Sequence, residues 1–393
     1  MQKKLLAVAV AGALGAPVIA MAQTSTVQIY GTAYIEYSWV RDQGQAGVAP
    51  LNDREKVDIL QSPGSNIGFK GEEKLGGGLS AWFQCESTAD IRGQSPEGFC
   101  SRNSALGMKG GFGNVFIGRW DTPFKRTISP TNVAGNDTGI WGTAFLLTGG
   151  STSTLDGSAR ATFKRRQANS INYDSPSFGG FQLMAAYSST NGATANTTGV
   201  TNSKARVMSI GGQYSAGPIY ISAAYEKHNE FGGPVGIGGS STDDDGWHVG
   251  ASYTWGPVRF GGTYTQQKLE ATSTTESKVK AWHLGVDWTI VGPHGLRAAY
   301  TQADDIKGNS TVALVGSSSI RPAAIGPGGV TGDTGAKLFQ IRYVYTFSKR
   351  TEFNFGYVKL SNDSRATYAL GGLSAPNGGE DQSAWAMSMR HTF

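Results

Sequence analysis

The sequence predicts an all-β fold, a 16-stranded antiparallel transmembrane β-barrel, and three observations lead to this prediction. Segments of about ten residues alternate between apolar and polar side chains, as the strands of a barrel do. Only 39% of the residues are hydrophobic, yet the chain holds 56 Gly, 9 Trp, 15 Tyr and 17 Phe. Residues 383–393 keep the alternation up to Phe393. Because only every second residue of a barrel strand faces lipid, a polar composition is compatible with a membrane-spanning fold.

Residues 1–22 are typical of a cleaved signal peptide. Lys3 and Lys4 precede an apolar run, which ends in the small-x-small pattern Ala20-Met21-Ala22 that signal peptidase cuts. The apolar run is shorter than the roughly 20 residues of a spanning helix. We therefore expect export, removal of residues 1–22, and a barrel formed by residues 23–393.

The order and limits of the strands can be predicted from the connections between them. Short turns rich in Gly, Pro or Ser join strands in pairs, at residues 74–78, 110–113, 175–180, 215–218, 255–257, 292–295 and 348–350. Longer polar stretches separate the pairs, at residues 41–59, 89–99, 123–163, 190–203, 231–243, 271–277, 307–333 and 363–380. Short periplasmic turns and long extracellular loops are typical of outer-membrane barrels. A soluble β-sandwich has no reason to segregate its loops by length.

Alternation also assigns each side chain to lipid or to the lumen. In the strand after the turn at 110–113, Phe116, Gly118 and Trp120 are assigned to the lipid face. Ile117 and Arg119 are then expected in the lumen. The same alternation places further polar and aromatic side chains in the lumen: Tyr30, Tyr34, Asn66, Lys70, Trp82, Asn103, Lys109 and Arg166. On residues 339–347 and 383–393 the aromatic and Met side chains form the lipid face.

Several motifs resemble those of the trimeric general porins of β-proteobacteria. They are GFKGEEKLGGGLSAWFQCES (68–87), MKGGFGNVFIGRWDTPF (108–124), RQANSINYDSPSFGGF (166–181) and the terminal RHTF. The resemblance covers the whole mature chain. It implies a homotrimer in the Gram-negative outer membrane, in contact with its lipid and lipopolysaccharide. It further implies passive diffusion of small hydrophilic solutes and ions, and a terminal Phe393 that is read by the barrel-assembly machinery.

In this family the third loop folds into the barrel and narrows the pore, and residues 123–163 are its counterpart by position. We expect an acidic side formed by Asp121, Asp137 and Asp156. The expected basic wall consists of Lys70, Lys109, Arg119 and Arg166. Opposed charges of this kind create a transverse field that filters ions. Arg166 matches an arginine position of the anion-selective members, whereas Asn66 and Asn103 stand where other members carry arginine, so the expected anion preference is weak to moderate.

The two cysteines, Cys85 and Cys100, are assigned to the outer face of adjacent strands. In an oxidising periplasm they can form a disulfide worth ~3 kcal/mol by the chain-entropy estimate. The alternative is two unrelated thiols. A metal site needs more ligands than this pair provides.

Other functions have little support in the sequence. Common hydrolase, metalloprotease and nucleotide-binding motifs are absent, and the five histidines are scattered. His248 beside Asp243, Asp244 and Asp245 is the one arrangement that a barrel enzyme could use. The net charge of +5 does not indicate nucleic-acid binding, and no cofactor is expected. A substrate-selective channel and a non-conducting barrel that serves as an adhesin or surface receptor remain open alternatives.

Overall fold

The computed structural model describes residues 27–43, 56–94, 98–136, 138–149, 151–152, 163–189, 206–229, 243–272, 274–309, 332–371, 373, 376 and 378–393. The predicted signal peptide, residues 1–22, lies outside the described residues, as do Asp137 and Asp156. Within the described ranges, no helix is both long and apolar enough to cross a bilayer.

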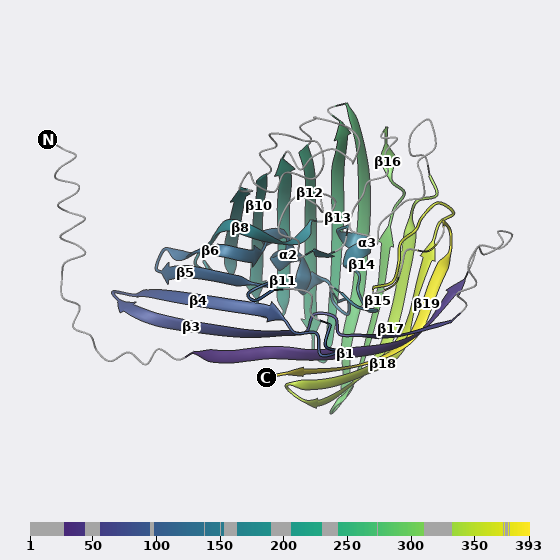
Figure 1. The fold of residues 1–393 in the computed structure, drawn as a ribbon, viewed down its shortest axis with the longest axis horizontal. Coiled ribbons are helices and arrows are strands. Elements are labelled where there is room, and N and C mark those ends of the chain that lie inside the picture. Colours follow the sequence, from purple (N-terminus) through teal and green to yellow (C-terminus); the bar gives the residue numbers. More distant parts are fainter. Residues whose placement is uncertain are drawn as a thin grey trace.

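The chain forms one antiparallel sheet that closes on itself (Figure 1). The strands are β1 (Gln28–Gln43), β2 (Val57–Gln61), β3 (Asn66–Gly76), β4 (Leu79–Thr88), β5 (Ser104–Gly110), β6 (Gly113–Asp121), β8 (Lys164–Asp174), β9 (Phe181–Ser189), β10 (Arg206–Ala216), β11 (Ile219–Asn229), β12 (Asp243–Trp255), β13 (Val258–Thr272), β14 (Thr275–Val291), β15 (His294–Ala303), β17 (Ala336–Ser348), β18 (Thr351–Asn362) and β19 (Asp381–Thr392). Both β2 and β3 pair with β1 and form one interrupted barrel strand. The predicted 16-stranded barrel is thereby confirmed.

Closure joins the two ends of the sheet. β1 pairs with β19 from Thr32–Thr392 to Gln43–Asp381. The backbone of Gly31 and that of Phe393 exchange two hydrogen bonds of 3.1 Å each. Two short pairings accompany the wall: β7 (Ser151–Thr152) runs parallel to β8, and β16 (Lys307–Gly308) pairs with β14.

The lipid and lumen faces follow the predicted alternation in most strands, but the assignment in β6 was wrong. Phe116 is 1% exposed and packs against Trp82 and Trp120, whereas Ile117 is 59% exposed. Phe116 therefore faces inward and Ile117 faces lipid. A register shift between Gly118 and Trp120 follows directly, so alternation does not carry through the end of this strand.

The loop predicted at residues 271–277 was also wrong. β13 runs to Thr272 and β14 starts at Thr275, so the connection is a tight hairpin. A cluster of ion pairs, one of which joins the two strands, explains why a polar sequence stays in the ladder. Lys268 Nζ lies 3.0 Å from Glu270 and 3.2 Å from Glu276, which also contacts Lys278 at 2.6 Å.

The described part of the loop between β6 and β8, residues 122–136, 138–149, 151–152 and 163, lies inside the barrel and is called the inner loop below. It contains α2 (Pro123–Ile128), the 3-10 helix η1 (Ser129–Thr131), α3 (Ala144–Leu147) and β7. α2 contacts β10, β11 and β12, and α3 contacts β14 and β15 (Figure 1). The inner loop therefore follows the lumen side of the wall before it returns to β8.

Candidate functional site

The inner loop enters the lumen as a short helix, α2, and its sequence favours a helix that begins at this point. Pro123 occupies the first turn of α2, where its missing N–H and fixed φ suit a helix. Phe124 and Ile128 are fully buried against the wall. Arg126, near the end of the helix, makes a bidentate ion pair with Asp174 of β8, with both N–O distances at 2.7 Å. The helix is thus fixed at both its apolar and its charged face.

Wall side chains then anchor the backbone of the inner loop. Ser222 Oγ donates to the Thr127 carbonyl at 2.8 Å, and His283 Nε2 lies 2.9 Å from the Val133 carbonyl. Thr265 Oγ1 donates to the Leu147 carbonyl at 2.6 Å. These hydrogen bonds satisfy carbonyl groups that would otherwise be buried without partners. The loop is therefore held along the wall by its backbone.

Glycines in the wall let the loop approach this closely. A Cβ at Gly285 would lie 1.8 Å from the Val133 carbonyl oxygen, and one at Gly261 would lie 2.3 Å from a Val133 methyl. A Cβ at Gly250 would lie 2.5 Å from Thr131 Oγ1. Since real Cβ atoms do not approach other atoms so closely, the inner loop can occupy this position only because these wall residues have no side chain.

The tip of the inner loop crosses to the opposite wall and is fixed there by Glu36 of β1. This carboxylate is 0% exposed. It accepts hydrogen bonds from the Ile140 N–H at 2.7 Å, Gln61 Nε2 at 2.5 Å and Tyr34 Oη at 2.8 Å. Several donors compensate for the burial of the charge. The crossing divides the lumen and leaves a narrowed space beside the tip.

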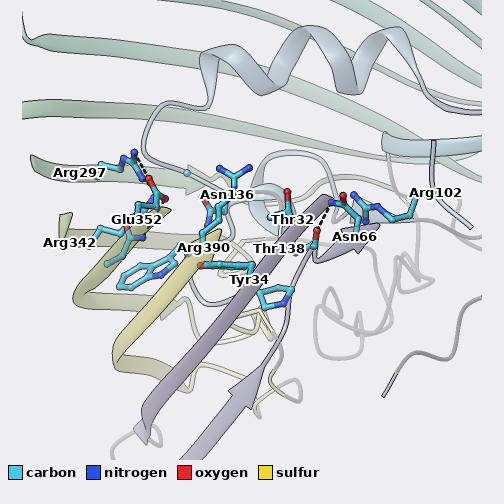
Figure 2. Close-up of a pocket in the computed structure, with 15 residues that line it drawn as sticks. Thr32, Tyr34, Asn66, Arg102, Asn136, Thr138, Arg297, Arg342, Glu352 and Arg390 are labelled. Atoms are coloured by element: carbon cyan, nitrogen blue, oxygen red, sulfur yellow. Dashed lines mark hydrogen bonds and ion pairs between the residues drawn. The ribbon is translucent and has the colours of Figure 1, made fainter. Parts of the chain in front are cut away.

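That narrowed space is a pocket of about 410 Å³ between the loop tip and the wall (Figure 2). Among the described residues that line it, the charged ones are Arg102, Arg297, Arg342, Glu352 and Arg390. Neutral polar groups from β1, β3 and the loop tip complete the lining: Thr32, Tyr34, Asn66, Asn136 and Thr138. Figure 2 shows Arg297, Glu352 and Arg342 at one end of the pocket and Arg102 with Asn66 at the other. We call this space the arginine pocket.

The arginines of the pocket differ in how far their charge is compensated. Arg297 contacts Asp287 at 2.9 Å and Glu352 at 3.2 Å, and Arg102 contacts Glu86 at 2.5 Å. No ion pair joins Arg342 or Arg390 to a carboxylate of the described residues. Arg390 stands opposite Glu352 in the β18–β19 ladder. Four arginines against one acid still leave the lining of the pocket with an excess of positive charge, which attracts anions and repels cations in a narrow lumen.

Arg342 is the most enclosed of these side chains. It is 3% exposed, lies over the Trp141 ring at 5.0 Å, and its Nη1 donates to Gln340 at 2.7 Å. Its Nε has no hydrogen-bond partner among the described atoms. It also stands directly opposite Arg297 in the β15–β17 ladder. Like charges in this position oppose folding, which indicates a functional reason for keeping them.

The residues expected at the constriction lie in three separate places, and none of the described ones lines the arginine pocket. Lys70 lies over the Tyr30 ring at 4.9 Å, and Lys109 pairs with Glu72 at 2.5 Å near the turn between β5 and β6. Arg119 stands opposite Ser104, beside the register shift of β6.

Asp121 and Arg166 are brought together at the root of the inner loop, at 3.1 Å. Lys125 joins the same carboxylate at 3.0 Å, and Asn103 bonds to both Arg166 and Asp121. The group ties the end of β6 to the start of β8. Asp137 and Asp156, the expected acids of the loop, lie outside the described residues.

Sequence reasoning missed the arginines of the pocket, although the signal was present. Arg342 and Arg390 lie on the face opposite to the aromatic and Met side chains of their strands, so alternation already placed them in the lumen. Basic partners of the loop were expected only in the strands close to it in sequence. The loop tip, however, crosses to β1 and β17, far away in sequence.

The structure also shows the environment of the two predicted cysteines and of His248. Cys85 and Cys100 form a disulfide, with their Cα atoms 4.8 Å apart. His248 Nε2 lies 2.9 Å from Thr127 Oγ1 and its ring packs edge-on against Phe124. The histidine thus takes part in anchoring the inner loop. Asp244 instead bonds the Glu270 N–H at 2.9 Å.

Comparisons with known proteins agree with this architecture. A family model described as Gram-negative porin matches residues 6–365. The outer membrane porin protein 32 of Delftia acidovorans is 27% identical over the full length of both chains. The major outer membrane protein P.IB of Neisseria meningitidis serogroup B is 31% identical over 58% of this chain and 61% of its own.

Solved structures share the fold. An anion-selective porin from Comamonas acidovorans superposes with a TM-score of 0.72 at 22% identity, over 94% of this chain and 100% of its own. The outer membrane protein OmpT of Vibrio cholerae, solved in a trimer form, superposes with a TM-score of 0.64 at 15% identity, over 94% and 100% of the two chains. The closed barrel, the inner loop and the family match over most of the sequence lead to one conclusion: the chain belongs to the Gram-negative porin family and is an outer-membrane porin.

Proposed function

We propose that this porin forms a water-filled channel for passive diffusion of small hydrophilic solutes, with a weak to moderate preference for anions, and that it has no enzymatic activity. The observation that carries the proposal is the arginine pocket, in which four arginines and one acid line the narrowed lumen. Of the four, Arg342 and Arg390 form no ion pair with a described carboxylate. Fixed charge of one sign in a narrow aqueous passage selects ions of the opposite sign.

The preference is expected to be limited, because much of the charge is compensated. Glu352, Asp287 and Glu86 lie within ion-pair distance of two of the arginines. The Comamonas porin that shares this fold is anion-selective, which supports the same sign of preference here. Asn66, at the far end of the pocket, adds a polar group without charge.

We further propose roles for the other predicted residues. Asp121 and Arg166 brace the root of the inner loop, and Lys70, Lys109 and Arg119 add positive charge around the lumen; Asp137 and Asp156 add negative charge to the loop. Residues 1–22 are a signal peptide, and Phe393 is the signal for the barrel-assembly machinery. The porin assembles as a homotrimer among outer-membrane lipid and lipopolysaccharide; the trimer form of the Vibrio protein supports this assembly.

Planar-bilayer recording of the purified porin tests the channel function. A diffusion channel gives single-channel currents that rise linearly with voltage and with salt concentration. Currents that a particular solute blocks at low concentration would instead identify a substrate-selective channel. Absence of current from correctly folded barrels would identify a non-conducting barrel, such as an adhesin or surface receptor.

A further inference from the structure

Arg102 lies beyond the end of a regular hairpin. The ladder between β4 and β5 stops at the pair Gln84–Ala105. Arg102 lies three residues before Ala105 in sequence and still lines the arginine pocket. Its position therefore depends on specific contacts and not on strand pairing.

Glu86 of β4 supplies the polar contacts. Its carbonyl accepts the Arg102 N–H at 2.8 Å, and its carboxylate accepts Arg102 Nε at 2.5 Å. Tyr30 Oη donates to the same carboxylate at 3.1 Å. The ion pair is partly exposed, with 20% of the Arg102 side chain and 12% of the Glu86 side chain accessible. Partly exposed ion pairs contribute little stability, so this contact alone holds Arg102 weakly.

Three further hydrogen bonds join this segment to β4: Ser101 Oγ accepts the Thr88 N–H at 3.2 Å, Ser104 Oγ accepts the Glu86 N–H at 3.0 Å, and the Asn103 carbonyl accepts Gln84 Nε2 at 2.9 Å. The disulfide adds the covalent constraint. Cys85 directly precedes Glu86, and Cys100 lies two residues before Arg102. The Cys100 N–H also donates to Ser87 Oγ at 2.9 Å. Cys100 has φ at 56°, a left-handed conformation that is unfavourable for a residue with a side chain. The surroundings must therefore impose it, and a covalent bond to β4 does so.

We propose that the Cys85–Cys100 disulfide is a positioning element for the pore: it holds Arg102 at the arginine pocket and thereby sets part of the ion selectivity. The inference rests on the proposed role of the pocket arginines. It assigns to the disulfide a function that a purely stabilising cross-link would not have. Without the bond, only hydrogen bonds and the Glu86 ion pair hold the segment before β5 to β4, and the Arg102 charge is less firmly placed beside the ion path.

A set of four channels tests this inference: wild type, Cys85→Ser/Cys100→Ser, Arg102→Gln, and the combination of all three substitutions. Each is purified as a folded barrel, and its reversal potential is measured in a KCl gradient. The cysteine variant is expected to move toward cations by at least half of the shift that Arg102→Gln produces. The combined variant is expected to match Arg102→Gln, because the disulfide acts through that arginine.

The outcomes separate the two proposals. A cysteine variant with the wild-type reversal potential, beside a shifted Arg102→Gln, overturns this inference and leaves the proposed function intact. An additional shift in the combined variant overturns it too, because the disulfide then acts through the barrel as a whole. If Arg102→Gln itself shifts nothing, Arg102 does not contribute to selectivity and this inference is overturned, whereas the proposed role of Arg342 and Arg390 is tested by their own substitutions.

Reduction of the assembled channel covers the case in which the cysteine variant does not fold. Tris(2-carboxyethyl)phosphine converts the disulfide into two thiols and is itself oxidised to the phosphine oxide with oxygen from water. The reduced wild type is expected to shift toward cations, and the reduced Arg102→Gln channel is expected to stay unchanged. An unchanged wild type, with both thiols verified by mass spectrometry, overturns the inference.

Discussion

At the scale of single residues, the charge of the pocket depends on four arginines that share a single acid, Glu352, in its lining. Arg342 has Arg297 opposite it on one side and Gly356 on the other. A Cβ at position 356 would lie 2.5 Å from Arg342 Cα, so the glycine leaves space for the arginine backbone. The local sequence thus accommodates a buried cation that a purely structural barrel would avoid.

Replacing Arg342 by Gln is expected to weaken the anion preference. A unit charge about 4 Å from an ion in water contributes ~1 kcal/mol, so the ratio of anion to cation permeability should fall severalfold. The measurement is the reversal potential in a salt gradient. Arg350→Gln removes the same charge from the turn between β17 and β18 and serves as the control. An equal shift in both variants would show that net charge, and not the pocket, sets selectivity.

Replacing Glu36 by Ala is expected to loosen the tip of the inner loop. The change leaves the Ile140 N–H, the Gln61 amide and the Tyr34 hydroxyl without their acceptor. Each unsatisfied buried donor costs ~1–3 kcal/mol. Single-channel recordings should show larger current fluctuations while the barrel remains folded. Glu36→Gln keeps one acceptor oxygen and should show smaller current fluctuations than Glu36→Ala. Equal fluctuations in both variants would contradict the anchoring role.

At the scale of elements, the wall strands and the inner loop form one fitted unit. Glycines and hydrogen-bonding side chains alternate along the lumen face where the loop lies, as with Gly261 and Thr263, or His283 and Gly285. The pattern cannot be recognised from single strands, because the role of a glycine on the lumen face becomes clear only once the position of the loop that packs on it is known.

A methyl group at Gly285 is expected to displace the inner loop. It would meet the Val133 carbonyl oxygen at 1.8 Å, an approach that backbone movement must relieve. Gly285→Ala should therefore change single-channel conductance while the barrel still folds. Gly212→Ala is the matched control, because its methyl would meet only Leu183 Cδ2 at 3.4 Å. If Gly285→Ala has the conductance of the wild type, the inner loop does not pack against Gly285.

The strands could be predicted from sequence because the alternation of side chains and the composition of the turns depend on residues that lie close together in the chain. The tight turns and the lipid faces of β12, β17 and β19 depend only on neighbours within a hairpin. Prediction failed where contacts between residues far apart in the sequence decide which way a side chain faces or where a strand ends. In β6, Phe116 turns inward because Trp82 of β4 and Trp120 pack around it. The hairpin of β13 and β14 continues because the Lys268–Glu276 ion pair bridges its strands.

At the scale of the whole molecule, closure and permeation depend on the same topology. β1 meets β19 across the ends of the chain, and the inner loop meets β1 across the lumen. Three of the four pocket arginines therefore come from the C-terminal strands, whereas Arg102 and the loop come from the first half of the chain. This is why charges near the loop in sequence did not identify the pocket.

Deleting Phe393 is expected to lower the yield of closed barrels. The deletion removes both the two backbone hydrogen bonds to Gly31 and the aromatic ring at the terminus. Phe393→Ala keeps the backbone and removes only the ring, so it separates ladder closure from the proposed assembly signal. Heat-modifiable mobility of outer-membrane fractions on mildly denaturing gels measures the folded fraction. Wild-type yields in both variants would show that neither contribution matters for assembly.

The reversal potential of the wild-type channel in a KCl gradient decides whether the pocket arginines give the lumen an excess of positive charge. We expect a value displaced toward the chloride equilibrium potential, and a displacement toward potassium once Arg342 and Arg390 are both replaced by Gln. A wild-type value on the potassium side, or one that the double substitution leaves in place, would show that the pocket does not set the selectivity of this porin.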